Sequence, residues 1–319
     1  MKKIYLILCF FLLSAIQLEA VETICSENEC YTVIEKLGEG AFGVVYSVED
    51  SQGQKYALKS YRTRNNLPSN VFEDLAREYQ RGQELNHQNI IKSVDMFTDS
   101  SNEEITSNLL LQLVEGKTLF NVAENTLSPL LTFNTISQFC DAIRYALSEN
   151  LLHFDLHDGN IMMANNHEIM VVDLASFFTL EEFIAFVEEM EAQPKYAKLD
   201  QGLKLDLGLK GKKMKQFLKR IEDFSENSGE NNRLAAKATI VKHLDPNLVL
   251  MVYYSTISAV GHRLLTKSSI GETDKLWMKK ELEGLDASLL VDYQAGNSIG
   301  SDDFFEKLIS IFQPFALVD

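Results

Sequence analysis

Residues 153–162 read His-Phe-Asp-Leu-His-Asp-Gly-Asn-Ile-Met, and this stretch decides the fold. It follows an apolar pattern with helical spacing and precedes the strand-like run 168–176, which contains Asp173. Transfer of a phosphoryl group needs an acceptor for a hydroxyl proton and oxygen ligands for hard Mg²⁺ ions. Asp155 fits the first role, and Asn160 and Asp173 fit the second. Each of these residues alone would more often be a turn, loop or cap residue.

A glycine-rich segment lies upstream of this stretch. Residues 37–45 read Leu-Gly-Glu-Gly-Ala-Phe-Gly-Val-Val and lie between two runs that alternate like strands. The glycines allow backbone N–H groups to approach phosphate oxygens, although glycines in a loop are more often only a tight turn. Residues 56–59 read Tyr-Ala-Leu-Lys and put Lys59 on the next predicted strand. Glu78 lies on the helix that the apolar spacing predicts for residues 71–85.

Taken together, these segments resemble the protein kinase family, which couples a glycine-rich loop and a strand lysine to a catalytic loop of this kind. The resemblance covers residue 31 to about residue 211. It implies an α+β, two-lobed protein-kinase-like fold, with a small β-rich N-lobe containing one helix (31–115) and a larger helical C-lobe (116–319). The apolar pattern agrees, because it alternates as far as Val114 and becomes helical after Gly116.

The resemblance also implies roles for individual residues and the use of ATP and Mg²⁺. Asp155 would accept the substrate proton, while Asn160 and Asp173 would bind the metal. Lys59 would hold the α and β phosphates, with Glu78 orienting it through an ion pair. The remaining nucleotide-binding positions implied are Leu37, Gly38, Gly40, Gly43, Val45, Ala57, the hinge residues Leu111, Gln112 and Leu113, and Met162.

Three departures from the family pattern affect the expected function. Phe154 replaces the arginine that usually precedes the catalytic aspartate, so pairing of that arginine with a phosphorylated activation loop is excluded. His157 stands where protein kinases usually carry lysine, and His-X-Asp-X-His-X-X-Asn resembles the catalytic loop of aminoglycoside and choline phosphotransferases and of some bacterial effector kinases. Leu174-Ala175 replaces Phe-Gly. The expected activity is a Ser/Thr-type protein kinase; a small-molecule phosphotransferase and a nucleotide-binding pseudokinase are the alternatives.

The segment after Asp173 carries a helix-start signal. Residues 179–182 read Thr-Leu-Glu-Glu, which is typical of a capping box, and Leu180 and Phe183 begin an apolar helix face. The opposite face carries Glu181 and Glu182 with further glutamates, and it would either attract a basic substrate or simply be solvated. Two later stretches, 248–265 and 304–312, are helical by their apolar spacing.

The N-terminus has the pattern of an export signal. Lys2 and Lys3 precede an apolar run, and Ala20 follows as a small residue that a signal peptidase accepts, so residues 1–20 are predicted to be a cleaved signal peptide. Residues 21–30 form an N-terminal segment in which Cys25 and Cys30 are close enough to form a disulfide in an oxidising compartment.

The charge balance limits the expected partners. The formal net charge of −16 disfavours nucleic acid and anionic membrane surfaces, so neither is an expected partner once the signal peptide is removed. The expected partner is a protein substrate, basic or host-derived. Because secreted fluids hold little ATP, we expect a secreted protein delivered into a host cell, with the periplasm or a eukaryotic secretory lumen as the alternative location.

Overall fold

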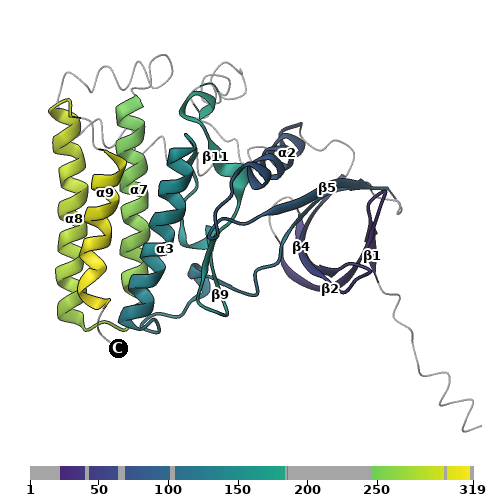
Figure 1. The fold of residues 1–319 in the computed structure, drawn as a ribbon, viewed down its shortest axis with the longest axis horizontal. Coiled ribbons are helices and arrows are strands. Elements are labelled where there is room, and N and C mark those ends of the chain that lie inside the picture. The colour runs from purple at the N-terminus through teal and green to yellow at the C-terminus, as the bar shows by residue number, and fades with distance from the viewer. Residues whose placement is uncertain are drawn as a thin grey trace, which may run out of the picture. The chain divides into compact units, whose positions relative to one another are not determined.

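The computed structural model describes residues 22–39, 43–63, 69–100, 105–183, 185, 246–297 and 300–316 (Figure 1). Gly40 and the predicted signal peptide lie outside the described residues. The chain divides into two compact units, one formed by residues 1–67 and 96–113 and the other by residues 68–95 and 114–319. The predicted helix near residues 71–85 therefore belongs to the second unit, whereas the sequence assigned it to a lobe spanning 31–115.

Strands dominate the first unit. Within the described residues they form one sheet in the order β1-β2-β3-β4-β6-β5, with antiparallel pairing from β1 through β6. The strands are β1 (Thr23–Cys25), β2 (Cys30–Glu39), β3 (Val44–Glu49), β4 (Lys55–Thr63), β5 (Ser93–Asp99) and β6 (Ile105–Gln112). β1 extends the sheet, so the predicted N-terminal segment 21–30 is part of this unit.

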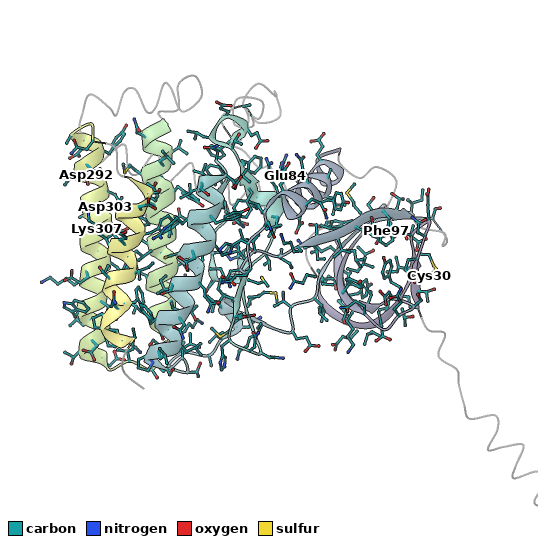
Figure 2. The ribbon with its side chains drawn as sticks, in the orientation of Figure 1. Cys30, Glu84, Phe97, Asp292, Asp303 and Lys307 are labelled. Atoms are coloured by element: carbon teal, nitrogen blue, oxygen red, sulfur yellow. A yellow bond between two sulfur atoms is a disulfide. The ribbon has the colours of Figure 1, made fainter. Side chains whose placement is uncertain are left out.

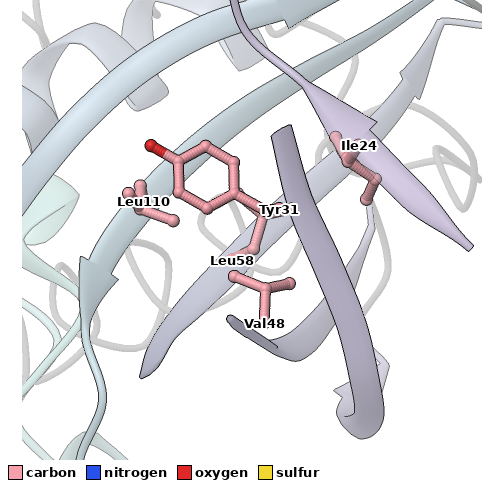
Figure 3. Close-up of a cluster of buried hydrophobic side chains, with 5 residues drawn as sticks. All are labelled: Ile24, Tyr31, Val48, Leu58 and Leu110. Carbon is pink, nitrogen blue, oxygen red and sulfur yellow. The ribbon is translucent and has the colours of Figure 1, made fainter. Parts of the chain in front are cut away.

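One face of this sheet forms a hydrophobic core. Because side chains alternate along a strand, every second residue of β3 and β4 reaches the same face. The buried cluster on it consists of Ile24, Tyr31, Val48, Leu58 and Leu110 (Figure 3). The ring of Tyr31 also stacks on Phe97 of β5, with 5.8 Å between ring centroids. The core of the unit therefore includes residues from β1 and β2 as well as from the strands that carry the predicted site.

A disulfide between Cys25 and Cys30 closes the β1–β2 hairpin, with 4.1 Å between the two Cα atoms. The N–H of Cys25 also donates to the Asp99 carboxylate at 3.2 Å, which ties the hairpin to the end of β5. Cys30 and Phe97 are labelled on this unit in Figure 2.

We expect the double substitution Cys25→Ser/Cys30→Ser to lower the free energy of unfolding by about 2 kcal/mol, because cross-linking so short a loop removes little chain entropy from the unfolded state. Denaturant titration of both proteins measures the difference. Reducing agent should lower wild-type stability to that of the variant, and an unchanged midpoint would contradict the prediction.

Helices dominate the second unit, which confirms the α+β class and the helical character expected after Gly116. α3, α7, α8 and α9 pack against one another as a layer (Figure 1). The helices with described bounds are α2 (Ser69–Glu84), α3 (Pro129–Ser148), α7 (Pro246–Lys267), α8 (Glu272–Gln294) and α9 (Ser301–Phe312). The predicted helices 248–265 and 304–312 lie within α7 and α9. α3 begins at Pro129 because Ser128 caps it by accepting a hydrogen bond from the N–H of Leu131.

Short strands and turns of the second unit carry the 153–162 stretch. β7 (Gly116–Thr118), β9 (Ile161–Ala164) and β10 (Ile169–Val171) form a small sheet, and β8 (Leu152–His153) pairs with β11 (Phe177–Phe178). Two 3₁₀ turns, η2 (Asp158–Asn160) and η3 (Leu174–Ser176), lie next to these strands. Among the described residues, no helix is both long and apolar enough to cross a membrane.

Candidate active site

Four of the residues predicted to bind nucleotide share one face of the sheet in the first unit: Val45, Ala57, Lys59 and Leu111. Val45 of β3 lies opposite Lys59 of β4, and Ala57 lies opposite Leu111 of β6. Ala57 and Lys59 are two residues apart, so the register brings all four side chains to the face opposite the hydrophobic core. An apolar surface with one cation at its edge fits a flat purine base and phosphates attached to it.

Among the described residues of the glycine-rich segment, Gly43 is at a position where only glycine fits. A Cβ on Gly43 would lie 2.4 Å from the carbonyl oxygen of Ser60, so the start of β3 approaches β4 too closely for any side chain. Gly38 pairs with Val45, and a Cβ there would meet open space. Leu37 lies at a register shift in the β2–β3 ladder, between Lys36 and Gly38, and is about half exposed.

The hinge residues lie at the end of β6 and directly after it. Leu111 is buried and Gln112 is exposed at the end of the strand, with Leu113 half-buried after it. Met162, the position predicted under the adenine, pairs with Met170 and Thr118 in the small sheet of the second unit.

Asp155 and Asn160 are joined directly in the second unit. The side-chain nitrogen of Asn160 donates to the backbone oxygen of Asp155 at 2.9 Å and to its carboxylate Oδ2 at 3.3 Å. These two hydrogen bonds orient the carboxylate and turn the amide oxygen of Asn160 away from it. The η2 turn produces this arrangement, because it brings a residue five positions along the chain back to the aspartate.

His153 links the Asp155 loop to the segment that carries Asp173. Its Nδ1 accepts a hydrogen bond from the N–H of Asp155 at 3.2 Å, and its Nε2 lies 3.2 Å from the carbonyl oxygen of Val172. A carbonyl can only accept, so the ring is neutral with its proton on Nε2. Burial lowers the pKa of His153, which agrees with a neutral ring.

This buried imidazole predicts a dependence of stability on pH. Because the pKa of His153 is lower in the folded than in the unfolded protein, the unfolded state binds more protons below about pH 6.5. We therefore expect the contribution of His153 to the free energy of unfolding to be complete above that pH. Below it, the free energy of unfolding should fall by up to about 1.4 kcal/mol per pH unit. Denaturant titrations between pH 8 and pH 5 measure the slope.

His153→Gln should make this slope shallower. His87, whose pKa is also lowered by burial, gives the matched control, because His87→Gln removes a separate contribution and leaves that of His153 in place. A slope that is the same in wild type and His153→Gln would contradict the assignment.

Asp173 adopts a left-handed backbone conformation, with φ 64° and ψ 57°. Aspartate is among the few non-glycine residues that tolerate this region, and residues held there often lie at functional sites. Ser176 donates its hydroxyl to the Asp173 carboxylate at 3.3 Å. The N–H of the neighbouring Val172 donates to the backbone oxygen of Asn160 at 3.0 Å, so the two predicted metal ligands lie on adjoining segments.

The donor set of these two residues fits Mg²⁺ bound together with phosphates. A carboxylate and an amide oxygen are ligands that this hard cation accepts, and it usually completes its shell with water and phosphate oxygens. Among the described residues, no group of three or more His, Cys, Asp or Glu side chains could hold a metal ion by itself. Asn160 and Asp173 would supply two ligands of a metal ion whose other ligands are water and phosphate oxygens.

His157 faces the Asp155 carboxylate from the other side. Its Nε2 lies 3.8 Å from Asp155 Oδ1, and its Nδ1 accepts from the N–H of Gly159 at 2.9 Å. A Cβ on Gly159 would lie 2.6 Å from the imidazole ring, so glycine is required there if the ring keeps this position. The histidine that stands in place of the usual lysine is thus part of the Asp155 environment.

Glu78 is buried on α2, and its backbone oxygen accepts from the hydroxyl of Ser93 at 3.0 Å. It belongs to the second unit, whereas its predicted partner Lys59 belongs to the first. The ion pair between Glu78 and Lys59 stays a prediction.

Sequence reasoning missed Arg81, which is buried on α2 and binds Glu182 through both carboxylate oxygens. The capping box itself is confirmed, because Thr179 and Glu182 exchange hydrogen bonds of 2.7 and 3.0 Å. Glu182 binds Arg81 although its side chain is 47% exposed, and attraction of a basic substrate by this acidic face stays a prediction. The two residues are 101 positions apart, and no local pattern relates them.

Comparison with known proteins agrees with this geometry. The model of the family described as "Protein kinase domain" matches residues 31–196, just over half of the chain. The chain belongs to the protein kinase domain family. The match covers Lys59, Glu78 and the complete 153–162 stretch, and it ends inside the segment that follows Asp173.

Individual protein kinases are similar to just under half of the chain. The calcium/calmodulin-dependent protein kinase type II of Caenorhabditis elegans is 34% identical over 153 residues, which is 47% of this chain and 21% of that protein. The cell cycle serine/threonine-protein kinase CDC5/MSD2 of Saccharomyces cerevisiae is 29% identical over 140 residues, 43% of this chain and 19% of that protein. The matched stretch thus spans less than a third of either relative, and the kinase relationship concerns the catalytic region.

Proposed function

We propose that this protein transfers the γ-phosphate of ATP to serine or threonine hydroxyls of a protein substrate. The observation that carries the proposal is the hydrogen-bonded set around Asp155, in which Asn160 orients the carboxylate and His153 links it to the segment of Asp173. Membership of the protein kinase domain family supports the same class of reaction, as does the similarity to a protein named as a serine/threonine-protein kinase.

In the proposed reaction, Asp155 binds the attacking hydroxyl and accepts its proton as the new oxygen–phosphorus bond forms and ADP leaves. Asn160 and Asp173 would hold Mg²⁺, which neutralises charge on the phosphates when bound. The sheet face formed by Val45, Ala57 and Leu111 would cover the adenine, and Lys59 would hold the α and β phosphates. The arrangement requires no covalent intermediate on the protein.

A second candidate is transfer to a small-molecule hydroxyl. The observation that favours it is His157, which approaches Asp155 in place of the lysine usual in protein kinases.

The export-like N-terminus supports a further proposal, that the protein is secreted and delivered into a host cell. Finding the mature protein confined to the periplasm would contradict delivery.

The test is incubation of the purified protein with γ-labelled ATP, Mg²⁺ and a host-protein lysate, with Asp155→Asn and Asp173→Asn run alongside. We expect label on protein that both substitutions abolish. Label that appears only on small hydroxyl compounds would support the second candidate. Nucleotide-induced stabilisation without any transfer would contradict both and indicate a pseudokinase.

A further inference from the structure

We propose that Arg81 and Glu182 are positioning residues that hold α2 against the segment after Asp173, so that phosphoryl transfer requires no prior phosphorylation of that segment. This inference rests on the proposed function, since it assigns the regulation of the same site. Four observations within the second unit support it.

The first observation is the geometry of Arg81. Its Nη2 donates to both carboxylate oxygens of Glu182, at 2.9 and 2.7 Å, and its Nη1 donates to Glu84 at 2.8 Å. Its Nε lies 3.5 Å from the carbonyl oxygen of Phe177. Arg81 is only 7% exposed, and a guanidinium this deeply buried needs such partners because an unpaired buried charge is strongly destabilising. Glu84 is labelled on α2 in Figure 2.

The second observation is that Glu182 is fixed from its own side as well. The N–H of Thr179 donates to its carboxylate at 2.7 Å, and the hydroxyl of Thr179 accepts from its N–H at 3.0 Å. Burial opposes ionisation of this carboxyl, but the Thr179 hydrogen bond and the Arg81 charge outweigh it and lower the pKa of Glu182. The group that Arg81 binds is therefore a permanent anion at neutral pH.

The third observation is that a second arginine, one helical turn earlier, contacts the same segment. Arg77 Nη1 lies 3.4 Å from the carbonyl oxygen of Ala175, and its guanidinium lies 4.4 Å from the centre of the Phe178 ring. Positions four apart share one face of a helix, so this face of α2 is bound along residues 175–182. Glu78 lies between the two arginines on α2, so contacts that fix this helix also fix the position of Glu78.

The fourth observation concerns Phe154, which occupies the position of the usual arginine. Its ring stacks on Phe183 with 3.8 Å between centroids and 9° between planes, and its N–H donates to the carbonyl oxygen of Ser176 at 3.0 Å. An arginine here would leave a cation that a phosphate could neutralise. Phenylalanine instead supplies a stacked aromatic contact, so the segment is bound to the Asp155 loop without any added charge.

Together these contacts hold the segment after Asp173 in place, which is what a phosphorylated residue paired with arginine would otherwise do. The Glu182 carboxylate is the anion that binds an arginine of α2, and the Phe154–Phe183 stack attaches the next turn to the catalytic loop. Both elements are present in the chain as synthesised. Removal of the anion should therefore affect the reaction, whereas removal of phosphate from the protein should not.

The test compares three proteins after phosphatase treatment, with intact mass used to show that no phosphate remains. Wild type should keep its full rate of phosphoryl transfer. Glu182→Gln, which preserves the shape but removes the charge, should lower kcat at least about tenfold, because hydrogen bonds to charged groups are the strong ones. Glu181→Gln, the exposed neighbouring acid, is the matched control and should retain the wild-type rate.

Three further readouts separate positioning from general destabilisation. Glu182→Asp should recover part of the lost kcat, thermal unfolding of Glu182→Gln should remain cooperative, and the KM for ATP should change less than kcat. Hydrogen exchange of the amides in α2 should be faster in Glu182→Gln than in Glu181→Gln.

Two outcomes would overturn the proposal while leaving the proposed function intact. One is loss of activity when phosphate is removed from wild type, and the other is a wild-type rate in Glu182→Gln. An inactive wild-type protein would instead show that the proposed function itself has failed, and the inference would fail with it.

Discussion

Replacement of Asp155 by asparagine is expected to lower kcat for phosphoryl transfer by about 10²–10⁴-fold, the range usual for loss of a general acid–base group. Asparagine cannot accept the hydroxyl proton, yet it keeps the size of the side chain and can still accept the hydrogen bond from Asn160. Steady-state kinetics with γ-labelled ATP measure the change. Because the substitution removes a chemical step and leaves the binding surface intact, KM should change much less than kcat.

Asp158→Asn provides the matched control for this measurement. Asp158 lies in the same 3₁₀ turn as Asn160 and carries the same charge as Asp155, but no role in the reaction falls to it. Its substitution should leave kcat within about twofold of wild type, because the contacts of Asp155 with Asn160 and His157 do not involve the Asp158 side chain. Equal losses in the two variants would indicate that the charge of the loop matters and that Asp155 has no special role.

Replacement of Asp173 by asparagine is expected to lower kcat by about 10²–10³-fold at ordinary Mg²⁺ concentrations, since charge stabilisation by a bound metal contributes several kcal/mol and each 1.36 kcal/mol is tenfold in rate. Asparagine tolerates the left-handed backbone of this position and can accept the hydrogen bond from Ser176. The loss can therefore be assigned to the missing carboxylate charge.

The dependence of this variant on metal concentration gives the sharper result. If Asp173 binds Mg²⁺, activity of Asp173→Asn should rise with Mg²⁺ concentrations at which wild type is already saturated, while Asp158→Asn should saturate like wild type. A uniform decrease that no Mg²⁺ concentration reverses would contradict the assignment of Asp173 as a metal ligand.

Much of the fold follows from local patterns that the sequence displays directly. Alternation of apolar residues predicts β3 and β4, and helical spacing predicts the stretches that lie in α7 and α9. The Thr179–Glu182 capping box is likewise readable, because cap hydrogen bonds join residues only three positions apart. The site residues were recognised because the family keeps them in a fixed order, and the order survives here despite Phe154 and His157.

The parts that could not be predicted are contacts between residues far apart in the chain. The burial of Arg81 and its pairing with Glu182 depend on how α2 packs against residues 175–182, and a basic residue on a helix gives no sign of its partner. The stack of Phe154 on Phe183 is of the same kind. These contacts also agree with the assignment of α2 to the second unit, although α2 follows β4 of the first unit in the sequence.

The sequence by itself therefore determined β3, β4, α7 and α9 and the identities of the groups suited to phosphoryl transfer, because these depend on residue type and on neighbours within a few positions. Only the tertiary structure decided the tautomer of His153, the pairing of Glu182 with the buried Arg81 and the contact of His157 with Asp155. Such properties arise from burial and from partners that the folded chain brings together, and side-chain chemistry responds to that environment more than to residue identity.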